Sequence, residues 1–343
     1  MRRRFLAALA GDHPTLPAGE FIAALEAEDL GFQVISKYGR LFTVEVDGDP
    51  LRAAVRCGML KALAFECFTC PHEVDTIISM AKTVDQSSLP RSRGSFAVRI
   101  WRLEDGSPGE VELLEKMLGG VLSKSLGLKV KLEDPMLTFV GFIAGEVFAL
   151  GLKLYVQPRR MFGARIPKNR PVVHPSTMDP RTARCMINLS RAKRSGVLLD
   201  PFCGVGGILL EAASIGCRTV GCDVNSRMVS GSVMNMKYYG FTPLGILVAD
   251  AARLPILEAD AIATDPPYGT AASTLKRGIR RILSEFLPEA ARILSPGGHV
   301  ALAAPKGAGL LEAAEDSGFK VREIHEVYIH RSLTREIASM KRG

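Results

Sequence analysis

Four consecutive residues, Asp265-Pro266-Pro267-Tyr268, combine two hydrogen-bond acceptors with a flat aromatic ring. The Asp265 carboxylate can accept a hydrogen bond from an amine N–H, and the Pro266 carbonyl can accept a second one because proline has no N–H of its own. An exocyclic NH2 group held by two acceptors turns its lone pair towards an electrophile. Tyr268 can stack on the base that carries this amine. We therefore take Asp265, Pro266, Pro267 and Tyr268 as candidate catalytic residues. A turn without a function is the competing interpretation.

A glycine-rich turn, Asp200-Pro201-Phe202-Cys203-Gly204-Val205-Gly206-Gly207, directly follows the apolar run 197–199 and opens a helical pattern. Glycines at such a turn let the backbone approach a ligand closely. Leu209 stands where the dinucleotide-binding GxGxxG pattern has its third glycine, and a Walker Lys-Ser/Thr pair is missing. By itself the glycine-rich turn is weak evidence for a ligand site, and the missing Walker pair excludes a P-loop.

Two more acids end the next two predicted strands. Asp223 stands where an acid can bind both hydroxyls of a ribose, and Asp250, followed by Ala251, stands where an acid can accept from an adenine amine. Ligands bind outside the carboxyl ends of parallel strands, so the three acids are expected to face one crevice. Each acid could instead cap a helix, which is a weaker explanation for three acids at successive strand ends.

Residues 181–343 alternate between strand-like and helix-like patterns, which predicts a parallel, doubly wound α/β sheet. The strands are predicted at Val197–Asp200, Thr219–Asp223, Gly245–Asp250, Ala259–Asp265 and His299–Ala303. Helices fit near 206–215, 226–239, 276–294 and 307–317. Two extended segments, Val321–His330 and Leu333–Met340, are expected to pair as a terminal antiparallel hairpin.

The preceding residues indicate two smaller α+β regions. Residues 1–70 begin with an apolar strand at Phe5–Leu9, followed by a helical pattern at Pro17–Leu30. Residues 71–156 contain the alternating strand Ser95–Leu103, an amphipathic helix at Glu110–Leu126 and short strands that predict a hairpin across Gly145. The segment 157–180 is rich in proline and is interpreted as a linker.

The charge of the chain is unevenly distributed. Of 343 residues, 44 are basic and 36 are acidic, and the whole net charge of +8 lies in residues 161–343. The segment 161–196 is the densest basic part. A second group consists of Lys276, Arg277, Arg280 and Arg281. Concentrated positive charge suits a polyanion, because contacts to phosphates release counterions. A solvated basic face without a partner explains the pattern equally well.

The seven cysteines and the apolar segments limit the cellular context. An odd cysteine count in a long chain without a signal peptide favours a reducing compartment, so we expect a cytoplasmic protein. Phe5–Leu9 is too short for a signal peptide and is expected to form a buried strand. No apolar run is long enough for a membrane span. Cys67 and Cys70 have no second pair to complete a zinc site, so no metal is expected.

The set Asp200…Gly204, Asp223, Asp250 and Asp265-Pro266-Pro267-Tyr268 resembles the motifs of class I, Rossmann-like methyltransferases that act on exocyclic amines. The resemblance covers residues 165–343 and implies S-adenosyl-L-methionine as the cofactor. The cofactor-binding residues that it implies are Pro175, Met178, Asp200, Phe202, Cys203, Gly204, Gly206, Asp223, Val224, Asp250, Ala251 and Asp265. Cys203 is interpreted as a structural member of this site, since an amine can attack the methyl group without a cysteine nucleophile.

The region before this domain resembles a THUMP domain, an RNA-binding module, through Ser95–Ile100 and Leu132-Glu133-Asp134-Pro135. A THUMP domain followed by this catalytic domain is similar to the archaeal tRNA (guanine-10-N2)-methyltransferases. The stretch from Arg170-Pro171 through His174-Pro175-Ser176-Thr177-Met178 to Ala183-Arg184 fits that family, where it lies next to the cofactor. The resemblance implies an N-terminal ferredoxin-like domain (1–70), a THUMP domain (71–156), a linker (157–180) and a methyltransferase domain (181–343).

The resemblance implies methyl transfer to N2 of a guanine in tRNA, with tRNA as the partner. Relatives that act on guanine-6 tend to carry asparagine at the position of Asp265, so the aspartate favours guanine-10. Guanine-6 of tRNA and a ribosomal RNA guanine remain alternatives, and a DNA amine methyltransferase would not need a THUMP-like region. A non-catalytic RNA-binding protein is the alternative from a different class. A monomer is expected. The sequence leaves open mono- or dimethylation and the need for a small activator subunit.

Overall fold

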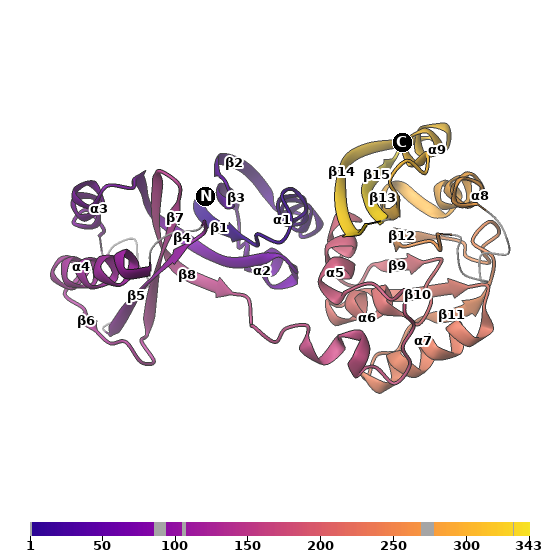
Figure 1. The fold of residues 1–343 in the computed structure, drawn as a ribbon, viewed down its shortest axis with the longest axis horizontal. Coiled ribbons are helices and arrows are strands. Elements are labelled where there is room, and N and C mark those ends of the chain that lie inside the picture. Colours follow the sequence, from indigo (N-terminus) through magenta and orange to yellow (C-terminus); the bar gives the residue numbers. More distant parts are fainter. Residues whose placement is uncertain (1, 86–93, 105–107, 269–277, 332) are drawn as a thin grey trace. The chain divides into compact units, whose positions relative to one another are not determined.

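The computed structural model describes residues 2–85, 94–104, 108–268, 278–331 and 333–343, so Gly269, Lys276 and Arg277 lie outside the described residues. The chain forms two compact units (Figure 1). The first comprises Met1–Asp12, Leu30–Val55 and Leu60–Pro158. The second comprises His13–Asp29, Arg56–Met59 and Arg159–Gly343.

The first unit is built on one eight-stranded sheet of order β2-β3-β1-β4-β8-β7-β5-β6. Its strands are β1 (Arg2–Leu9), β2 (Gly31–Tyr38), β3 (Leu41–Asp47), β4 (Leu60–Pro71), β5 (Ser95–Arg102), β6 (Lys129–Val130), β7 (Leu137–Ala144) and β8 (Val147–Val156). β4 pairs with both β1 and β8, so residues from 1–70 and from 71–156 share this sheet. The division into a ferredoxin-like and a THUMP domain stays a prediction.

Helices α3 (Val74–Ala81) and α4 (Pro108–Leu126) cover part of this sheet. Leu114, Leu118 and Leu122 recur at helical spacing and form one apolar stripe of α4 in the core. The predicted buried first strand is confirmed by β1, whose last five residues are buried. The predicted hairpin is confirmed by the antiparallel pairing of β7 with β8 across Gly145, which has a φ of 57°. A short helix, α2 (Leu51–Arg56), precedes β4.

The second unit contains a seven-stranded sheet of order β11-β10-β9-β12-β13-β15-β14. Its strands are β9 (Val197–Asp200), β10 (Arg218–Asp223), β11 (Gly245–Val248), β12 (Ala259–Thr264), β13 (Leu294–Pro305), β14 (Phe319–His330) and β15 (Leu333–Arg342). The first five run parallel, and β15 is antiparallel to β13 and β14. The predicted doubly wound sheet and the terminal hairpin are therefore confirmed. The strand order reverses between β9 and β12, which is where open α/β sheets bind ligands.

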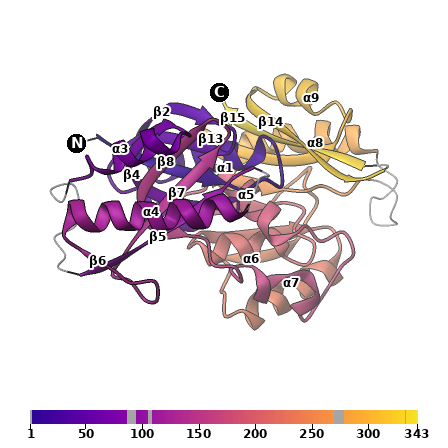
Figure 2. The same cartoon turned by 60° about the vertical axis from the view of Figure 1, so that its left-hand side comes forward.

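Helices cover both faces of this sheet. α8 (Ile279–Ile293) and α9 (Leu310–Asp316) lie side by side and pack on one face through a core that includes Leu283, Phe286 and Val300 (Figure 2). α5 (Pro180–Leu189), α6 (Gly207–Ser214) and α7 (Ser226–Tyr238) form the other layer. None of the described helices is both long enough and apolar enough to cross a membrane.

Helix α5 was not expected from the sequence, because it begins inside the proline-rich basic region. Pro180 occupies its first turn, where proline costs no hydrogen bond, and the Asp179 carboxylate caps it by accepting from the N–H groups of Arg181 and Thr182. The segment before it contains only two short 3-10 turns, Gly163–Arg165 and Pro167–Asn169, in agreement with the predicted lack of regular structure.

Helix α1 (Leu16–Ala27) belongs to the second unit and packs against α5. The fully buried Glu20 carboxylate accepts hydrogen bonds from the Gly58 N–H at 2.6 Å, the Met59 N–H at 2.7 Å and the Asn188 side chain at 2.8 Å. Burial raises the pKa of Glu20. No pattern in the sequence indicates this packing, because its partners lie far away along the chain.

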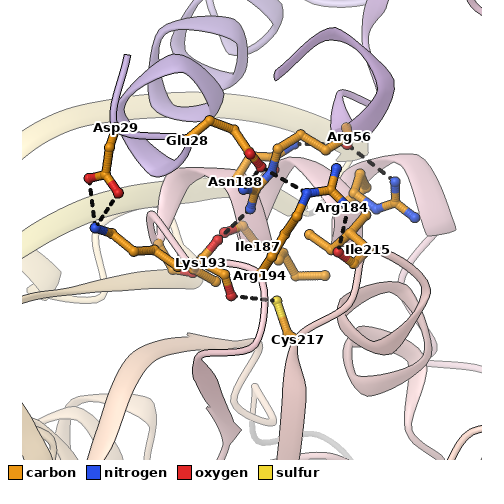
Figure 3. A network of polar contacts seen from close by, with 12 residues as sticks. Glu28, Asp29, Arg56, Arg184, Ile187, Asn188, Lys193, Arg194, Ile215 and Cys217 are labelled. Atoms are coloured by element: carbon orange, nitrogen blue, oxygen red, sulfur yellow. Dashed lines mark hydrogen bonds and ion pairs between the residues drawn. The ribbon is translucent and has the colours of Figure 1, made fainter. Parts of the chain in front are cut away.

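Much of the basic segment 161–196 is neutralised within the second unit. Near the end of α1, Asp29 pairs with Lys193 at 2.6 Å and Glu28 pairs with Arg194 at 3.2 Å (Figure 3). The side chain of Arg56 donates to Glu28 Oε1 and to Asn188 Oδ1, both at 2.8 Å. Lys193, Arg194 and Arg56 therefore form ion pairs with acidic side chains of the same unit. Neither of the two interpretations made from the sequence, a polyanion site and a solvated face without a partner, describes such pairs.

Candidate active site

Two of the three acids expected to face one crevice, Asp200 and Asp223, lie near Asp265 of the candidate catalytic motif in the second unit, and the convergence of the third, Asp250, stays a prediction. Asp200 is the last residue of β9, Asp223 is the last residue of β10, and Asp265 directly follows β12. The Thr264 hydroxyl donates to Asp200 Oδ1 at 2.7 Å, which ties the ends of β9 and β12 together. The pKa of Asp200 is raised to about 7, mainly by burial and to a smaller extent by the charges of Asp223 and Asp265, against two hydrogen bonds that lower it.

The glycine turn is held by Asp223. The Gly204 N–H donates to Asp223 Oδ2 at 3.0 Å, and the Asn225 N–H donates to Oδ1 at 2.8 Å. Gly204 and Gly206 have φ angles of 50° and 84°, which side chains rarely allow. A Cβ atom on Gly206 would also lie 2.4 Å from the Ser232 hydroxyl. The turn therefore requires glycine at these positions.

A cavity opens above this turn. Six of the predicted site residues line it, namely Met178, Asp200, Phe202, Cys203, Gly204 and Asp265. The lining is completed by His174, Ser176 and Thr177, from the stretch that the resemblance placed next to the cofactor, and by Val205, Gly207 and Ile208, which were not among the predicted cofactor-binding residues. The glycine turn and the segment just before α5 thus line one cavity, which can hold a small ligand.

The other predicted cofactor-binding residues do not line this cavity. Gly206 and Asp223 shape the turn itself, and Val224 follows Asp223 and is exposed. Asp250 follows β11, and its carboxylate accepts from the Ala252 N–H at 3.0 Å. Ala251 beside it is buried in the hydrophobic core. Pro175 lies between two lining residues, His174 and Ser176. Their roles towards a cofactor stay predictions.

The candidate catalytic motif presents a carboxylate that already has partners. Asp265 pairs with Arg335 Nη2 at 3.2 Å and accepts a hydrogen bond from the Tyr268 hydroxyl. The Arg335 guanidinium also lies over the Tyr268 ring, 5.4 Å from its centroid. Burial raises the pKa of Asp265, while Arg335 and Tyr268 lower it. Burial likewise raises the pKa of Tyr268. Pro266 is buried and Pro267 is partly buried in the same turn.

Arg335 is a site residue that the sequence analysis missed. It lies on β15, where it pairs with Pro305 of β13, and no motif surrounds it in the sequence. Its Nε atom is buried and has no hydrogen-bond partner among the described residues. The terminal hairpin brings this cation to Asp265, so the hairpin completes the site as well as the sheet.

No disulfide joins the seven cysteines, all of which lie in the described residues. Burial raises the pKa of Cys203 in the glycine turn, which agrees with a structural role and disfavours a thiolate nucleophile. Cys67 and Cys70 lie on β4 of the first unit. In the described part of the chain no three His, Cys, Asp or Glu side chains are grouped as metal ligands.

We expect Asp200→Asn to stabilise the folded protein increasingly as the pH rises. A carboxyl group whose pKa is raised on folding contributes stability below its unfolded value of 3.8, and this contribution is lost as the pH rises through about 7. Asparagine keeps both hydrogen bonds, because Thr264 and the Phe202 N–H donate to the same oxygen, Oδ1. Thermal unfolding of the ligand-free protein at about pH 5 and pH 8 measures the effect.

The control for this prediction is Asp316→Asn, which changes an exposed acid at the end of α9. Its melting temperature should follow that of the unchanged protein at both pH values. An Asp200→Asn variant with the same difference in melting temperature at both pH values would show that Asp200 does not titrate in this range.

Comparison with known proteins agrees with this geometry. The family model for the RMKL-like methyltransferase domain matches residues 167–337. The chain is 36% identical to a tRNA (guanine(10)-N2)-dimethyltransferase of Methanothermobacter thermautotrophicus, over 97% of this chain and 98% of the relative. It is 31% identical to the enzyme of the same name from Methanocaldococcus jannaschii, again over 97% and 98%. A tRNA (guanine(6)-N2)-methyltransferase of Thermus thermophilus is 31% identical over 68% of this chain and 69% of the relative.

Solved structures show the same fold. TrmN from Thermus thermophilus superimposes with a TM-score of 0.54 at 24% identity, over 99% of this chain and 100% of that one. SMU.472, described as a putative methyltransferase complexed with SAH, superimposes with a TM-score of 0.53 at 14% identity, over 99% and 98%. The Rossmann-like sheet expected from the sequence is therefore confirmed.

Proposed function

The chain belongs to the family of tRNA (guanine(10)-N2)-dimethyltransferases, and on this premise we propose that it methylates the exocyclic N2 of guanine-10 in tRNA. The methyl donor is S-adenosyl-L-methionine. The observation that carries the proposal for the site is the position of Asp265 and Tyr268. They stand at the end of β12, beside the cavity above the glycine turn and at the point where the strand order reverses.

The residues around the cavity suit this cofactor. Gly204 has no atom within 4 Å of the position that a Cβ would take, so a ligand can approach its backbone closely. Asp223 at the end of β10 is placed to bind ribose hydroxyls, and Asp250 after β11 is placed to accept from an adenine amine. The cofactor supplies an electrophilic methyl group on a sulfonium, so that the protein contributes mainly positioning.

We assign the orientation of the target base to the Asp265-Pro266-Pro267-Tyr268 turn. Asp265 and the Pro266 carbonyl accept from the two N–H groups of N2, while the Tyr268 ring stacks on the guanine after the base has left the tRNA stack. The cofactor would supply the methyl group to the N2 lone pair and leave as the neutral thioether, and Asp265 would take up the N2 proton that is released. Arg335 favours the charged carboxylate that must receive this proton, because it opposes the rise in the pKa of Asp265 that burial causes.

To bind the guanine amine, Asp265 must exchange one hydrogen-bond partner for another. In the free protein the Tyr268 hydroxyl occupies the acceptor that the guanine amine needs. Entry of the base must break this hydrogen bond and free the Tyr268 ring for stacking, whereas the ion pair to Arg335 can remain. Asp265 thus has two partners, Arg335 and Tyr268, before a base arrives.

We assign tRNA binding to the THUMP-like part of the first unit, residues 71–156. Such binding is electrostatic and salt-dependent. Lys124, Lys129 and Lys131 are exposed in and after α4 and supply positive charge there. We further propose a monomer that acts in the cytoplasm, where cysteines without disulfides are stable.

Two alternatives to guanine-10 methylation are a guanine-6 methyltransferase and a non-catalytic RNA-binding protein. A guanine-6 enzyme is the nearer alternative, since one such relative matches about two thirds of the chain. Two guanine-10 relatives match nearly the whole chain, which favours guanine-10. A non-catalytic RNA-binding protein would not need a cofactor cavity with a catalytic turn at its edge.

Methylation of unmodified tRNA transcripts with labelled S-adenosylmethionine tests the proposal. We expect label in N2-methylguanosine or N2,N2-dimethylguanosine with a transcript that carries guanine-10, and none with its adenine-10 counterpart. Nucleoside analysis identifies the product and settles mono- versus dimethylation. Label that persists with adenine-10 would move the target to another guanine, with guanine-6 tested next. A protein that does not bind the cofactor would overturn the enzymatic proposal.

A further inference from the structure

The β14–β15 hairpin continues past the strand that it joins. β15 pairs with β13 as far as Arg335, which lies opposite Pro305, the last residue of β13. The pairing of β15 with β14 goes on beyond this point to His330 opposite Leu333 (the yellow strands in Figure 2). Two residues of a strand extend about 7 Å, so the hairpin protrudes past the end of β13 by about this distance before it turns.

The protruding part begins beside the candidate catalytic turn. Arg335 contacts Asp265 and lies over the Tyr268 ring. Thr334, the next residue towards the turn of the hairpin, accepts a hydrogen bond from the Lys306 N–H at 2.8 Å, just past the end of β13. β12 and β13 are parallel, so their carboxyl ends meet at one edge of the sheet. Helices cover both faces of the sheet, so a base that reaches Asp265 must arrive from this edge, where the hairpin protrudes.

The protruding part, which we call the hairpin end, exposes side chains of the kinds that bind nucleic acid. Its described residues are Tyr328, Ile329, His330, Arg331, Leu333 and Thr334. Tyr328 is 69% exposed, more than any other tyrosine, phenylalanine or tryptophan among the described residues, and Ile329 is 40% exposed. Arg331 is also exposed. This combination suits RNA, because each base offers a flat face for stacking and each phosphate offers a negative charge.

Two further cations lie near the base of the hairpin end. Arg280, from the second basic group of the sequence, is exposed at the start of α8, and its Nη2 lies 3.5 Å from the carbonyl of Gly307, shortly after β13. Lys306 pairs with Glu326 at 2.7 Å, and about half of each side chain is exposed. An exposed ion pair of this kind is weak, so an RNA phosphate can compete for Lys306.

We propose that the hairpin end contacts the RNA stem beside the target guanine, and that Tyr328 stacks on the bases next to the gap that the extruded guanine leaves. The inference rests on the proposed function, because only an enzyme that extrudes a paired base creates this gap. Extrusion loses the stacking of the guanine on its neighbours, and an inserted ring restores part of it. Tyr268 stacks on the extruded guanine, whereas Tyr328 acts on the stem. Tyr328 is thus a positioning residue that does not touch the reacting atoms.

Single-turnover methylation of two tRNA transcripts at saturating cofactor tests this role. The target guanine keeps its base-pairing partner in the first transcript and is left unpaired in the second, by a change of the partner nucleotide. For Tyr328→Ala we expect the methylation efficiency on the paired transcript to fall by about 10- to 100-fold, as the loss of one base–aromatic stack allows. On the unpaired transcript the loss should be less than about 3-fold, because an unpaired base costs less to extrude.

Two further variants separate stacking from other effects. Tyr328→Phe keeps the ring and should methylate both transcripts with nearly the normal efficiency. Tyr238→Ala removes a tyrosine that is 64% exposed at the end of α7. α7 begins just after the carboxyl end of β10, so Tyr238 lies towards the opposite edge of the sheet, and we expect no effect on either transcript. All variants should bind S-adenosylhomocysteine as the unchanged protein does.

Three results would overturn the inference. Tyr328→Ala and Tyr238→Ala could methylate the paired transcript equally well, which would leave no RNA contact at the hairpin end. An equal loss on the paired and unpaired transcripts would show that the ring does not favour extrusion. A loss of affinity for S-adenosylhomocysteine in Tyr328→Ala would assign the hairpin end to the cofactor.

A failure of the proposed function looks different. In that case the unchanged protein methylates neither transcript, and the affinity for tRNA, measured by fluorescence anisotropy with S-adenosylhomocysteine present, decides whether the hairpin end binds RNA. Weaker binding by Tyr328→Ala than by Tyr238→Ala would support the RNA contact without the reaction. Equal binding by the two variants would contradict both the contact and the proposed function.

Discussion

Replacing Asp265 by asparagine is expected to lower the rate of methyl transfer to tRNA by about 10²- to 10⁴-fold, with a far smaller effect on cofactor affinity. Asparagine has the same size and can still accept one hydrogen bond, but it cannot take up the N2 proton. It also leaves Arg335 without the carboxylate that lies 3.2 Å from its Nη2 atom. Single-turnover methylation at saturating cofactor measures the rate, and titration with S-adenosylhomocysteine measures the affinity.

Asp316→Asn serves as the matched control, because it changes an exposed aspartate at the end of α9. This variant should methylate tRNA at the normal rate. If Asp265→Asn kept the full rate, the amine would be deprotonated elsewhere and the role assigned to the turn would be wrong. If both variants lost cofactor binding, the defect would lie in folding.

The second large effect concerns stability. Glu211→Gln is expected to lower the free energy of unfolding by about 3–5 kcal/mol, because it removes the one buried carboxylate between Arg165 and Arg184. The variant keeps the volume of the side chain, so the loss reports the uncompensated guanidinium charges. Urea denaturation, followed by a spectroscopic signal and by resistance to protease, measures the change.

Glu285→Gln provides the comparison, since Glu285 pairs with Arg281 on the exposed side of α8. Such surface pairs contribute little, and we expect almost no change in stability. A Glu211→Gln variant as stable as Glu285→Gln would mean that the arginines around α6 find other partners.

The sheet of the second unit could be predicted from sequence because its signals are local. The strands β9 and β10 are short apolar runs that end in an aspartate, as in Val197–Asp200, and a helical pattern follows each of them. The glycine turn could be placed for the same reason. Its φ angles of 50° and 84° at Gly204 and Gly206 are a backbone requirement that glycine satisfies directly.

The remaining features depend on contacts between distant parts of the chain. Arg335 reaches Asp265 through the antiparallel pairing of β15, and its local sequence resembles any exposed strand. The cations of the basic segment have acidic partners such as Glu28 and Asp29, well over a hundred residues earlier. Helix α5 was missed because proline and arginine density obscured its apolar face.

The path of the chain has a consequence for how the protein is made. Helix α1 leaves the ribosome long before α5, yet it packs against α5, which is synthesised more than 150 residues later. Domains generally fold in the order of synthesis, so the strands of the first unit can pair while α1 still lacks its partner. The second unit therefore closes late, and a fragment that begins at residue 159 would lack the helix that supplies Glu20, Glu26 and Glu28.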